Sequence, residues 1–144
     1  MSRFHILIAE DDADDRYLYE TAFAEKGIKD PVKFVHDGVE LMQYLEKIFE
    51  TKEESEPNLP YFILLDLNMP KKDGKEVLGS IKQHPVFKKI PVIIFTTTKN
   101  EQEIKLCYEL GANTYIVKPS SFDSLMKVLE GIRNYWFNIA SIAS

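Results

Sequence analysis

The sequence predicts an α/β fold in which a parallel five-stranded sheet lies between two layers of helices. Strand-like and helix-like stretches alternate five times along the 144 residues, which is typical of parallel strands joined by right-handed crossovers. Four of the five apolar runs are too uniformly apolar for a sheet with one wet face. We therefore expect helices on both faces.

The five expected strands are the apolar runs Phe4–Ala9, Val32–Val35, Tyr61–Leu65, Val92–Phe95 and Thr114–Val117. The helices are recognised by apolar residues at helical spacing. We expect them at Asp12–Lys26, Asp37–Phe49, Gly74–Gln83, Asn100–Leu110 and from about Ser121 onward. The turn formers agree, because Gly27, Pro31, Pro60, Pro70, Pro85, Pro91 and Gly111 all lie between these elements.

The last predicted helix is long. From Phe122 onward its apolar residues stand at positions 122, 125, 129, 132, 136, 139 and 143, a continuous helical stripe. A helix of about 22 residues is roughly 33 Å long, whereas a six-residue strand is only about 20 Å long. We expect its end to extend past the sheet and to leave Trp136, Phe137, Ile139 and Ile142 without a core partner. Our hypothesis is that this end packs against another subunit; the alternative is a tail that folds back or frays.

The composition is that of one globular domain spanning residues 1–144. Apolar residues make up 44% and charged residues 28%, which excludes a disordered chain, and no apolar run is long enough to cross a membrane. The acidic insertion 50–59 is expected to be a solvated loop. The formal net charge of −5 argues against nucleic acid as the main partner.

Two observations favour a cytoplasmic location. The N-terminus, MSRFHILIAEDD, meets acidic residues at once and does not have the pattern of a signal peptide. Cys107 is the single cysteine and cannot form an internal disulfide, which fits a reducing compartment. We expect Cys107 to be a small buried or half-buried apolar residue of the fourth helix.

Chemically active residue types gather at the ends of the predicted strands. They are Glu10, Asp11 and Asp12 after the first strand, Asp66 after the third, Thr96 after the fourth and Lys118 after the fifth. The carboxyl ends of parallel strands meet at one edge of the sheet, where α/β proteins bind their ligands. A single aspartate at a strand end has an ordinary explanation as a helix cap. For Asp12, which precedes the first helix, a capping role and a role in the site are equally plausible. The joint arrangement predicts a functional site.

Clustered carboxylates repel one another unless a bound cation compensates them. Oxygen ligands favour Mg²⁺, which takes one or two carboxylates together with waters and a phosphate oxygen. The three histidines, His5, His36 and His84, are scattered without zinc-ligand spacing, and we interpret them as structural or exposed. The strand ends therefore predict a magnesium site.

Four segments, ILIAEDD, LLDLNMPKKDGKEVL, PVIIFTTT and GANTYIVKPS, resemble in order the signature segments of response regulator receiver domains. The resemblance covers nearly the whole chain. It implies the flavodoxin-like doubly wound (βα)5 fold, a three-layer sandwich with strand order 2-1-3-4-5. The acidic insertion and the long last helix are similar to those of stand-alone receivers that pair with phytochrome-type histidine kinases.

The resemblance implies that Asp66 is the phosphoacceptor. Glu10 and Asp11 match the acidic pair that binds Mg²⁺, with Asp11 the more direct ligand, and Asn68 matches the position whose backbone carbonyl binds the metal. A carboxylate such as that of Asp66 can attack phosphorus and form an acyl phosphate.

The resemblance also implies a counter-charge and a switch. Lys118 matches the lysine that stabilises the phosphoryl charge, and the family implies a cis bond between Lys118 and Pro119. Thr96 matches the switch hydroxyl and Tyr115 the switch aromatic. When Thr96 moves toward the phosphate, Tyr115 can swing inward and change the surface made by helix 4, strand 5 and helix 5.

These roles describe the response regulator of a phosphorelay. Its phosphoryl group would come from a phosphohistidine on a sensor histidine kinase or a histidine phosphotransfer protein. The signal would leave through protein–protein contact, with a homodimer through the last helix and the helix 4–strand 5–helix 5 face as one hypothesis. Such a chain is no enzyme beyond its own phosphorylation and dephosphorylation.

Three other functions are considered. A Mg²⁺-dependent phosphatase with an aspartate nucleophile needs a second aspartate where Asn68 stands. A pseudo-receiver that acts by contact alone would not need the intact acidic, hydroxyl and lysine set. A flavin or dinucleotide module needs a glycine-rich loop after the first strand, which the sequence lacks.

Overall fold

The computed structural model describes residues 5–50 and 59–142. Five parallel strands form one sheet in the order β2-β1-β3-β4-β5, as predicted. Their bounds are β1 Ile6–Ala9, β2 Val32–Val35, β3 Phe62–Leu65, β4 Val92–Thr96 and β5 Thr114–Val117. Because β1, β3 and β4 are central, their carboxyl ends lie side by side at one edge of the sheet.

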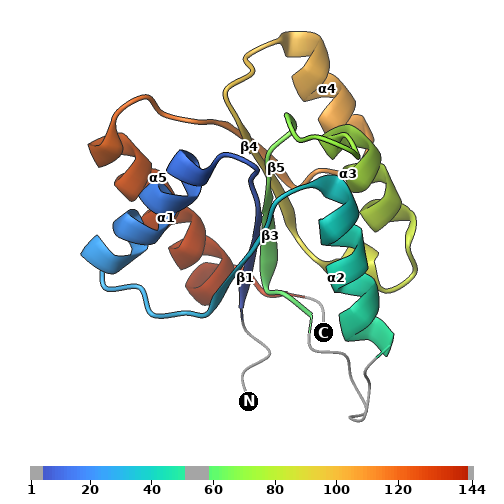
Figure 1. Ribbon diagram of the computed structural model, residues 1–144, viewed down its shortest axis with the longest axis horizontal. Helices are drawn as coiled ribbons and strands as arrows, with labels where there is room; N and C mark the ends of the chain where they lie inside the picture. Colours follow the sequence, from blue (N-terminus) through green and yellow to red (C-terminus); the bar gives the residue numbers. More distant parts are fainter. Residues whose placement is uncertain (1–4, 51–58, 143–144) are drawn as a thin grey trace.

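Helices cover both faces of the sheet, which confirms the predicted three layers. Their bounds are α1 Ala13–Glu25, α2 Gly38–Glu50, α3 Gly74–Gln83, α4 Glu101–Glu109 and α5 Phe122–Asn134. Figure 1 shows α1 and α5 on one face and α2, α3 and α4 on the other. Within the described part of the chain, no helix is long and apolar enough to cross a membrane.

The core is divided by the sheet into two clusters. Along β1, Ile6 and Ile8 pack toward α1 and α5, whereas Leu7 and Ala9 pack toward α2, α3 and α4. All four are at most 1% exposed. A strand buried on both faces has no alternation of polar and apolar residues, which explains the uniformly apolar runs of the sequence. Cys107 is fully buried in the second of these clusters, as expected.

Capping side chains fix the starts of α1 and α3. The carboxylate of Asp12 accepts a hydrogen bond from the Asp14 N–H at 2.8 Å, which confirms Asp12 as the cap of α1. Asp73 forms a capping box with Glu76 at the start of α3. Both helices therefore begin at fixed points beside the predicted site.

The predicted overhang of the last helix is wrong. The regular helix α5 ends at Asn134, and a π-helical turn follows over Tyr135–Ile139. This turn brings the chain back to the amino-terminal end of β3. There the ring of Phe137 lies 4.4 Å from that of Tyr61, and Phe137 and Trp136 pack against the core between the sheet and α5. These aromatic contacts favour the alternative of a tail that folds back, although Ile139 stays 64% exposed.

Two further expectations concern the peptide bond before Pro119 and the acidic loop 50–59. The structure contains no cis peptide bond among its described residues, so the implied cis bond between Lys118 and Pro119 is wrong here. The trans form is the more stable one for most bonds before proline, and with it the Lys118 side chain still reaches the carboxylates. The acidic loop 50–59 lies almost entirely outside the described residues.

Candidate functional site

Buried polar side chains concentrate at the carboxyl edge of the sheet. Taken as whole residues, Glu10 after β1, Asp66 after β3 and Thr96 at the end of β4 are 1%, 6% and 0% exposed. A buried charged or polar group is costly unless it is paired, so each of the three requires a partner. The partners come from β5, from α1 and from the loop after β3.

Three carboxylates converge at this edge. Glu10, Asp11 and Asp66 each offer one oxygen, and these oxygens all lie within 4.8 Å of one another. Among the described residues no other group of this kind is found. Three like charges at this spacing favour the binding of a cation, and an all-oxygen set suits a hard divalent ion such as Mg²⁺.

Lys118, which follows β5, provides the positive charge. Its Nζ lies 2.7 Å from Glu10, 3.1 Å from Asp66 and 3.2 Å from Asp15. An ammonium has three N–H bonds, and the three carboxylates match them in number. Burial alone would lower the pKa of Lys118, but the surrounding negative charges outweigh it and raise that pKa above the ordinary lysine value. Lys118 therefore stays charged.

Glu10 is held by several donors. The Tyr19 hydroxyl donates to Oε1 at 3.0 Å, where Lys118 also donates, and the Asp12 N–H donates to Oε2 at 3.3 Å. Burial raises the pKa of Glu10 to about 7, against the lowering effect of its hydrogen bond with Lys118. Because both oxygens of Glu10 already accept hydrogen bonds, the exposed carboxylate of Asp11 is better placed to bind a metal directly.

The loop after β3 completes the surroundings of Asp66. The Asn68 N–H donates to Asp66 Oδ1 at 3.2 Å, and the Asn68 amide lies 3.5 Å from the Thr96 hydroxyl. The loop ends at Gly74, where only glycine fits. A Cβ there would lie 2.7 Å from the Leu67 Cα and 2.8 Å from the Asp66 carbonyl oxygen, both too close. The glycine thus permits the close approach of α3 to the strand end.

Tyr115 lies apart from the carboxylates. Its hydroxyl donates to the carbonyl oxygen of Thr98 at 2.9 Å, and its ring is half-buried against the core beneath α2, α3 and α4. The structure brings six of the seven predicted residues together: Glu10, Asp11, Asp66, Asn68, Thr96 and Lys118. Tyr115 contacts the loop that follows Thr96 instead.

Sequence reasoning missed two residues of α1 that contact the site, Asp15 and Tyr19. They are four residues apart in α1 and therefore lie on one face of that helix, from which both side chains contact Lys118 or Glu10. The spacing of Asp15 and Tyr19 along the predicted helix could have indicated them. They were missed because the prediction considered only residues that directly follow a strand.

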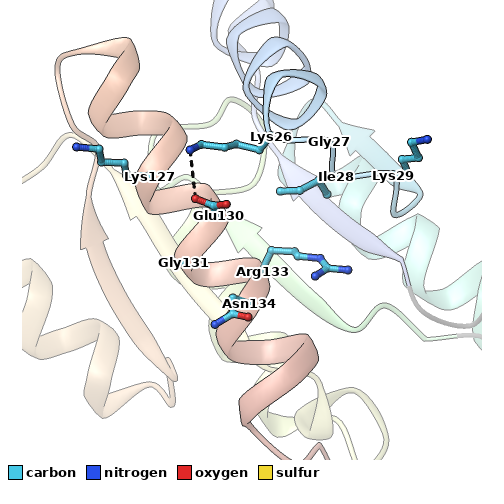
Figure 2. A pocket seen from close by; sticks show the side chains of 9 residues that line it. All are labelled: Lys26, Gly27, Ile28, Lys29, Lys127, Glu130, Gly131, Arg133 and Asn134. Carbon is cyan, nitrogen blue, oxygen red and sulfur yellow. Dashed lines mark ion pairs between the residues drawn. The ribbon is translucent and has the colours of Figure 1, made fainter.

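A second hollow lies between the α1–β2 turn and α5 and has a volume of about 520 Å³. Figure 2 shows Lys26 paired with Glu130 across this hollow, and the two charged atoms are 3.3 Å apart. Arg133, which also lines the hollow, forms an ion pair with Asp30 at 2.7 Å. This hollow is at the amino-terminal side of the sheet, away from the carboxylates. Because two of its cations are already neutralised, it is a weaker candidate site.

The carboxyl edge combines the buried carboxylate of Asp66, a fixed ammonium and a group of carboxylates that could hold a cation. This combination suits phosphoryl transfer, which depends on positioning and on electrostatic stabilisation rather than on elaborate covalent chemistry. Comparison with known proteins identifies the class. Residues 6–130 match the response regulator receiver domain family, and the chain belongs to that family of two-component signalling proteins.

The similar proteins narrow this class. The chain is 38% identical to response regulator Rcp1 of Synechocystis sp. over 95% of its own length and 91% of that protein. The crystal structure of the phosphorylated cyanobacterial phytochrome response regulator RcpA matches with a TM-score of 0.85 and 38% identity over the whole of both chains. The Mn²⁺-bound form of Rcp1 matches with a TM-score of 0.81 and 36% identity, covering 96% of this chain and 98% of that one. The chain is thus similar to receivers associated with phytochromes.

Proposed function

We propose that the chain is the response regulator of a phosphorelay and that Asp66 accepts a phosphoryl group from a phosphohistidine in a Mg²⁺-dependent reaction. One observation carries the proposal: the Asp66 carboxylate lies 3.1 Å from the Lys118 ammonium and within 4.8 Å of the oxygens of Glu10 and Asp11. The proposed nucleophile Asp66, the counter-charge of Lys118 and the proposed cation site thus lie together at the carboxyl edge of the sheet.

In the proposed step, a carboxylate oxygen of Asp66 forms a bond to phosphorus. The bond between phosphorus and the histidine nitrogen breaks, and its electron pair returns to the imidazole. Lys118 stays protonated and donates to a phosphoryl oxygen, which stabilises the developing charge. Asp66 is therefore the substrate of the transfer, and the chain needs no further enzymatic activity of its own.

We assign the metal to Asp11, Asp66 and the backbone carbonyl of Asn68, with Glu10 supporting it through the residues that it contacts. Bound Mg²⁺ would neutralise phosphoryl oxygens and draw the phosphoryl group toward Asp66. The oxygen-only donor set supports this assignment. The Mn²⁺ bound to the related Rcp1 supports it as well.

The switch is assigned to Thr96 and Tyr115. In the proposal the Thr96 hydroxyl donates to a phosphoryl oxygen and leaves the Asn68 amide, a weak contact at 3.5 Å. Tyr115 then gives up the carbonyl of Thr98 and moves inward. The surface formed by α4, β5 and α5 changes with it, so the phosphoryl group is converted into a protein–protein signal.

The proposed donor is a sensor histidine kinase of the phytochrome type or a histidine phosphotransfer protein. Two similar structures support this choice: RcpA is a cyanobacterial phytochrome response regulator, and a response regulator of R. palustris acts in red light signalling. We propose one receiver domain for residues 1–144 and a cytoplasmic location, which fits the buried, unpaired Cys107. Neither nucleic acid nor a membrane is needed for this function.

A second copy of the chain is the proposed partner of the β5 and α5 surface. An apolar hollow of about 400 Å³ lies there, lined among others by Ile116, Val128, Tyr135 and Trp136. Tyr135 is 48% exposed, and Ile139, in the same π-helical turn, is 64% exposed. Large exposed apolar side chains gathered in one place are typical of protein contact sites.

The proposed reaction is tested by intact mass. The protein is incubated with acetyl phosphate and Mg²⁺, and we expect a gain of one phosphoryl group that EDTA prevents. Asp66→Asn removes the nucleophile and should abolish the gain, whereas Asp123→Asn, at an exposed aspartate of α5, should keep it. A gain that survives Asp66→Asn, or none in the natural sequence, would overturn the proposal.

A further inference from the structure

The third contact of Lys118 has no part in the reaction proposed above. Asp15 lies in the first turn of α1, and its Oδ2 is 3.2 Å from the ammonium. Its side chain is 33% exposed, whereas those of Glu10 and Asp66 are 2% and 8% exposed. Asp15 therefore binds the ammonium from the rim of the site, and the other two carboxylates bind it from the interior.

Asp15 is itself held in place. Asp12 caps the first turn of α1, and the Arg16 guanidinium donates to the Glu10 carbonyl oxygen at 2.9 Å. One turn further along, the buried Tyr19 donates to the Glu10 carboxylate. The turn that carries Asp15 is thus capped by Asp12 and attached at two points to Glu10, which follows β1, and this fixes the carboxylate relative to Asp66.

We propose that Asp15 is a positioning residue for phosphoryl transfer, acting through Lys118. It shares the ammonium and keeps it at the rim, where the phosphoryl oxygens arrive. Without Asp15, the ammonium would bind only Glu10 and Asp66. It would then lie deeper and hold the nucleophilic oxygen of Asp66 more tightly. This inference rests on the proposed function.

The contact between Asp15 and Lys118 also holds the ammonium while the phosphoryl group is transferred. The ammonium must exchange its bond with Asp66 for one with a phosphoryl oxygen. During this exchange Asp15 and Glu10 can keep the other two N–H bonds, so Lys118 turns without losing its place. A fixed donor that needs little reorganisation during the reaction is what stabilises a developing charge most effectively.

The kinetic test compares Asp15→Asn with Asp14→Asn. Asp14 is the exposed neighbour in the same turn, so both variants lose one charge at the start of α1. With acetyl phosphate and saturating Mg²⁺, we expect Asp15→Asn to lower the maximal phosphorylation rate about tenfold, with little change in the apparent KM. Asp14→Asn should keep the natural rate, and Asp15→Glu should recover most of it. Equal rates for Asp15→Asn and the natural sequence, or equal losses in both asparagine variants, would overturn the proposal.

A spectroscopic test separates this proposal from the proposed function. In metal-free protein labelled with ¹⁵N-lysine, the Lys118 ammonium should give an NMR signal protected from exchange by its three partners. We expect Asp15→Asn, but not Asp14→Asn, to shift this signal and speed its hydrogen exchange. If the natural sequence is not phosphorylated at all, the proposed function fails. The NMR signal of Lys118 then still tests whether Asp15 holds the ammonium. An Asp15→Asn spectrum identical to the natural one contradicts the contact.

Discussion

Lys118 is the residue on which the charge balance of the site depends. It contacts the buried carboxylates of Glu10 and Asp66, which would otherwise repel each other in a poorly solvated place. The sequence predicted these residues because each stands directly after a strand. Asp15 and Tyr19 were missed, because they reach the site from a helix and only the folded chain shows where their side chains point.

Removal of Lys118 should make stability depend on the metal. In Lys118→Ala the buried carboxylates lose their counter-charge, which we expect to destabilise the metal-free protein by about 3 kcal/mol. Mg²⁺ can replace part of that charge, so urea unfolding should show a larger Mg²⁺-induced stabilisation in the variant than in the natural sequence. Asp14→Asn serves as the surface control. An equal response to Mg²⁺ in all three proteins would contradict this charge balance.

Cys107 predicts a pH dependence of stability. Burial, aided by the nearby Glu103 carboxylate, raises the pKa of the Cys107 thiol from 9.0 to about 11. Between these values the unfolded chain loses the thiol proton while the folded chain keeps it, so the stability from Cys107 is complete below pH 9 and is lost as the pH rises toward 11. Urea unfolding of Cys107→Ala should therefore differ from the natural sequence by a margin that narrows by about 2 kcal/mol over this range. Parallel pH profiles would show that the thiol does not contribute.

At the scale of elements, the prediction was most accurate where a strand or cap fixes the boundary. The helix α3 has the predicted bounds, Gly74–Gln83, because Asp73 and Glu76 form a capping box at its start. The C-terminal segment was predicted less well. Its apolar stripe continues past residue 134, but the aromatic rings of the last turn find partners at the base of β3, and periodicity contains no information about such contacts.

The last turn should therefore contribute to stability. Phe137 lies 4.4 Å from the Tyr61 ring and 5.9 Å from the Phe62 ring, and the Arg133 guanidinium stacks on it at 4.9 Å. We expect Phe137→Ala to lower the free energy of unfolding by about 2 kcal/mol, below the range for a fully buried phenylalanine because the ring is only partly buried. Ile139→Ala, at an exposed position of the same turn, should change it by less than about 0.5 kcal/mol. Equal effects would contradict the packing of this turn.

At the scale of the whole molecule, the topology produces the site. A parallel sheet of order 2-1-3-4-5 brings the ends of β1, β3 and β4 together, so residues more than 80 positions apart in sequence meet at one edge. The alternation of elements and the strand-end residues made this predictable from the sequence. The surface proposed to meet other proteins was less predictable, because it depends on side chains that the core leaves exposed.

The proposed homodimer is tested by sedimentation velocity. We expect the natural sequence to sediment as a dimer at micromolar concentration and the double variant Tyr135→Asp with Ile139→Asp to sediment as a monomer, because charge would be placed in the apolar contact. A chain that ends at Asn134 is a poorer test, since it also removes Phe137 from the core. Tyr17→Asp, at an exposed position of α1, is the control. A natural sequence that remains monomeric would contradict the proposal.

The central claim is that Asp66 receives the phosphoryl group, and it is tested most directly by finding the modified residue. The protein is treated with phosphoramidate, whose P–N bond resembles that of phosphohistidine, together with Mg²⁺. Borohydride then reduces the acyl phosphate, and the product is located by peptide mass mapping. We predict homoserine at position 66 and at no other acidic position. Reduction at Glu10, Asp11 or Asp15, or at no residue at all, would contradict the account.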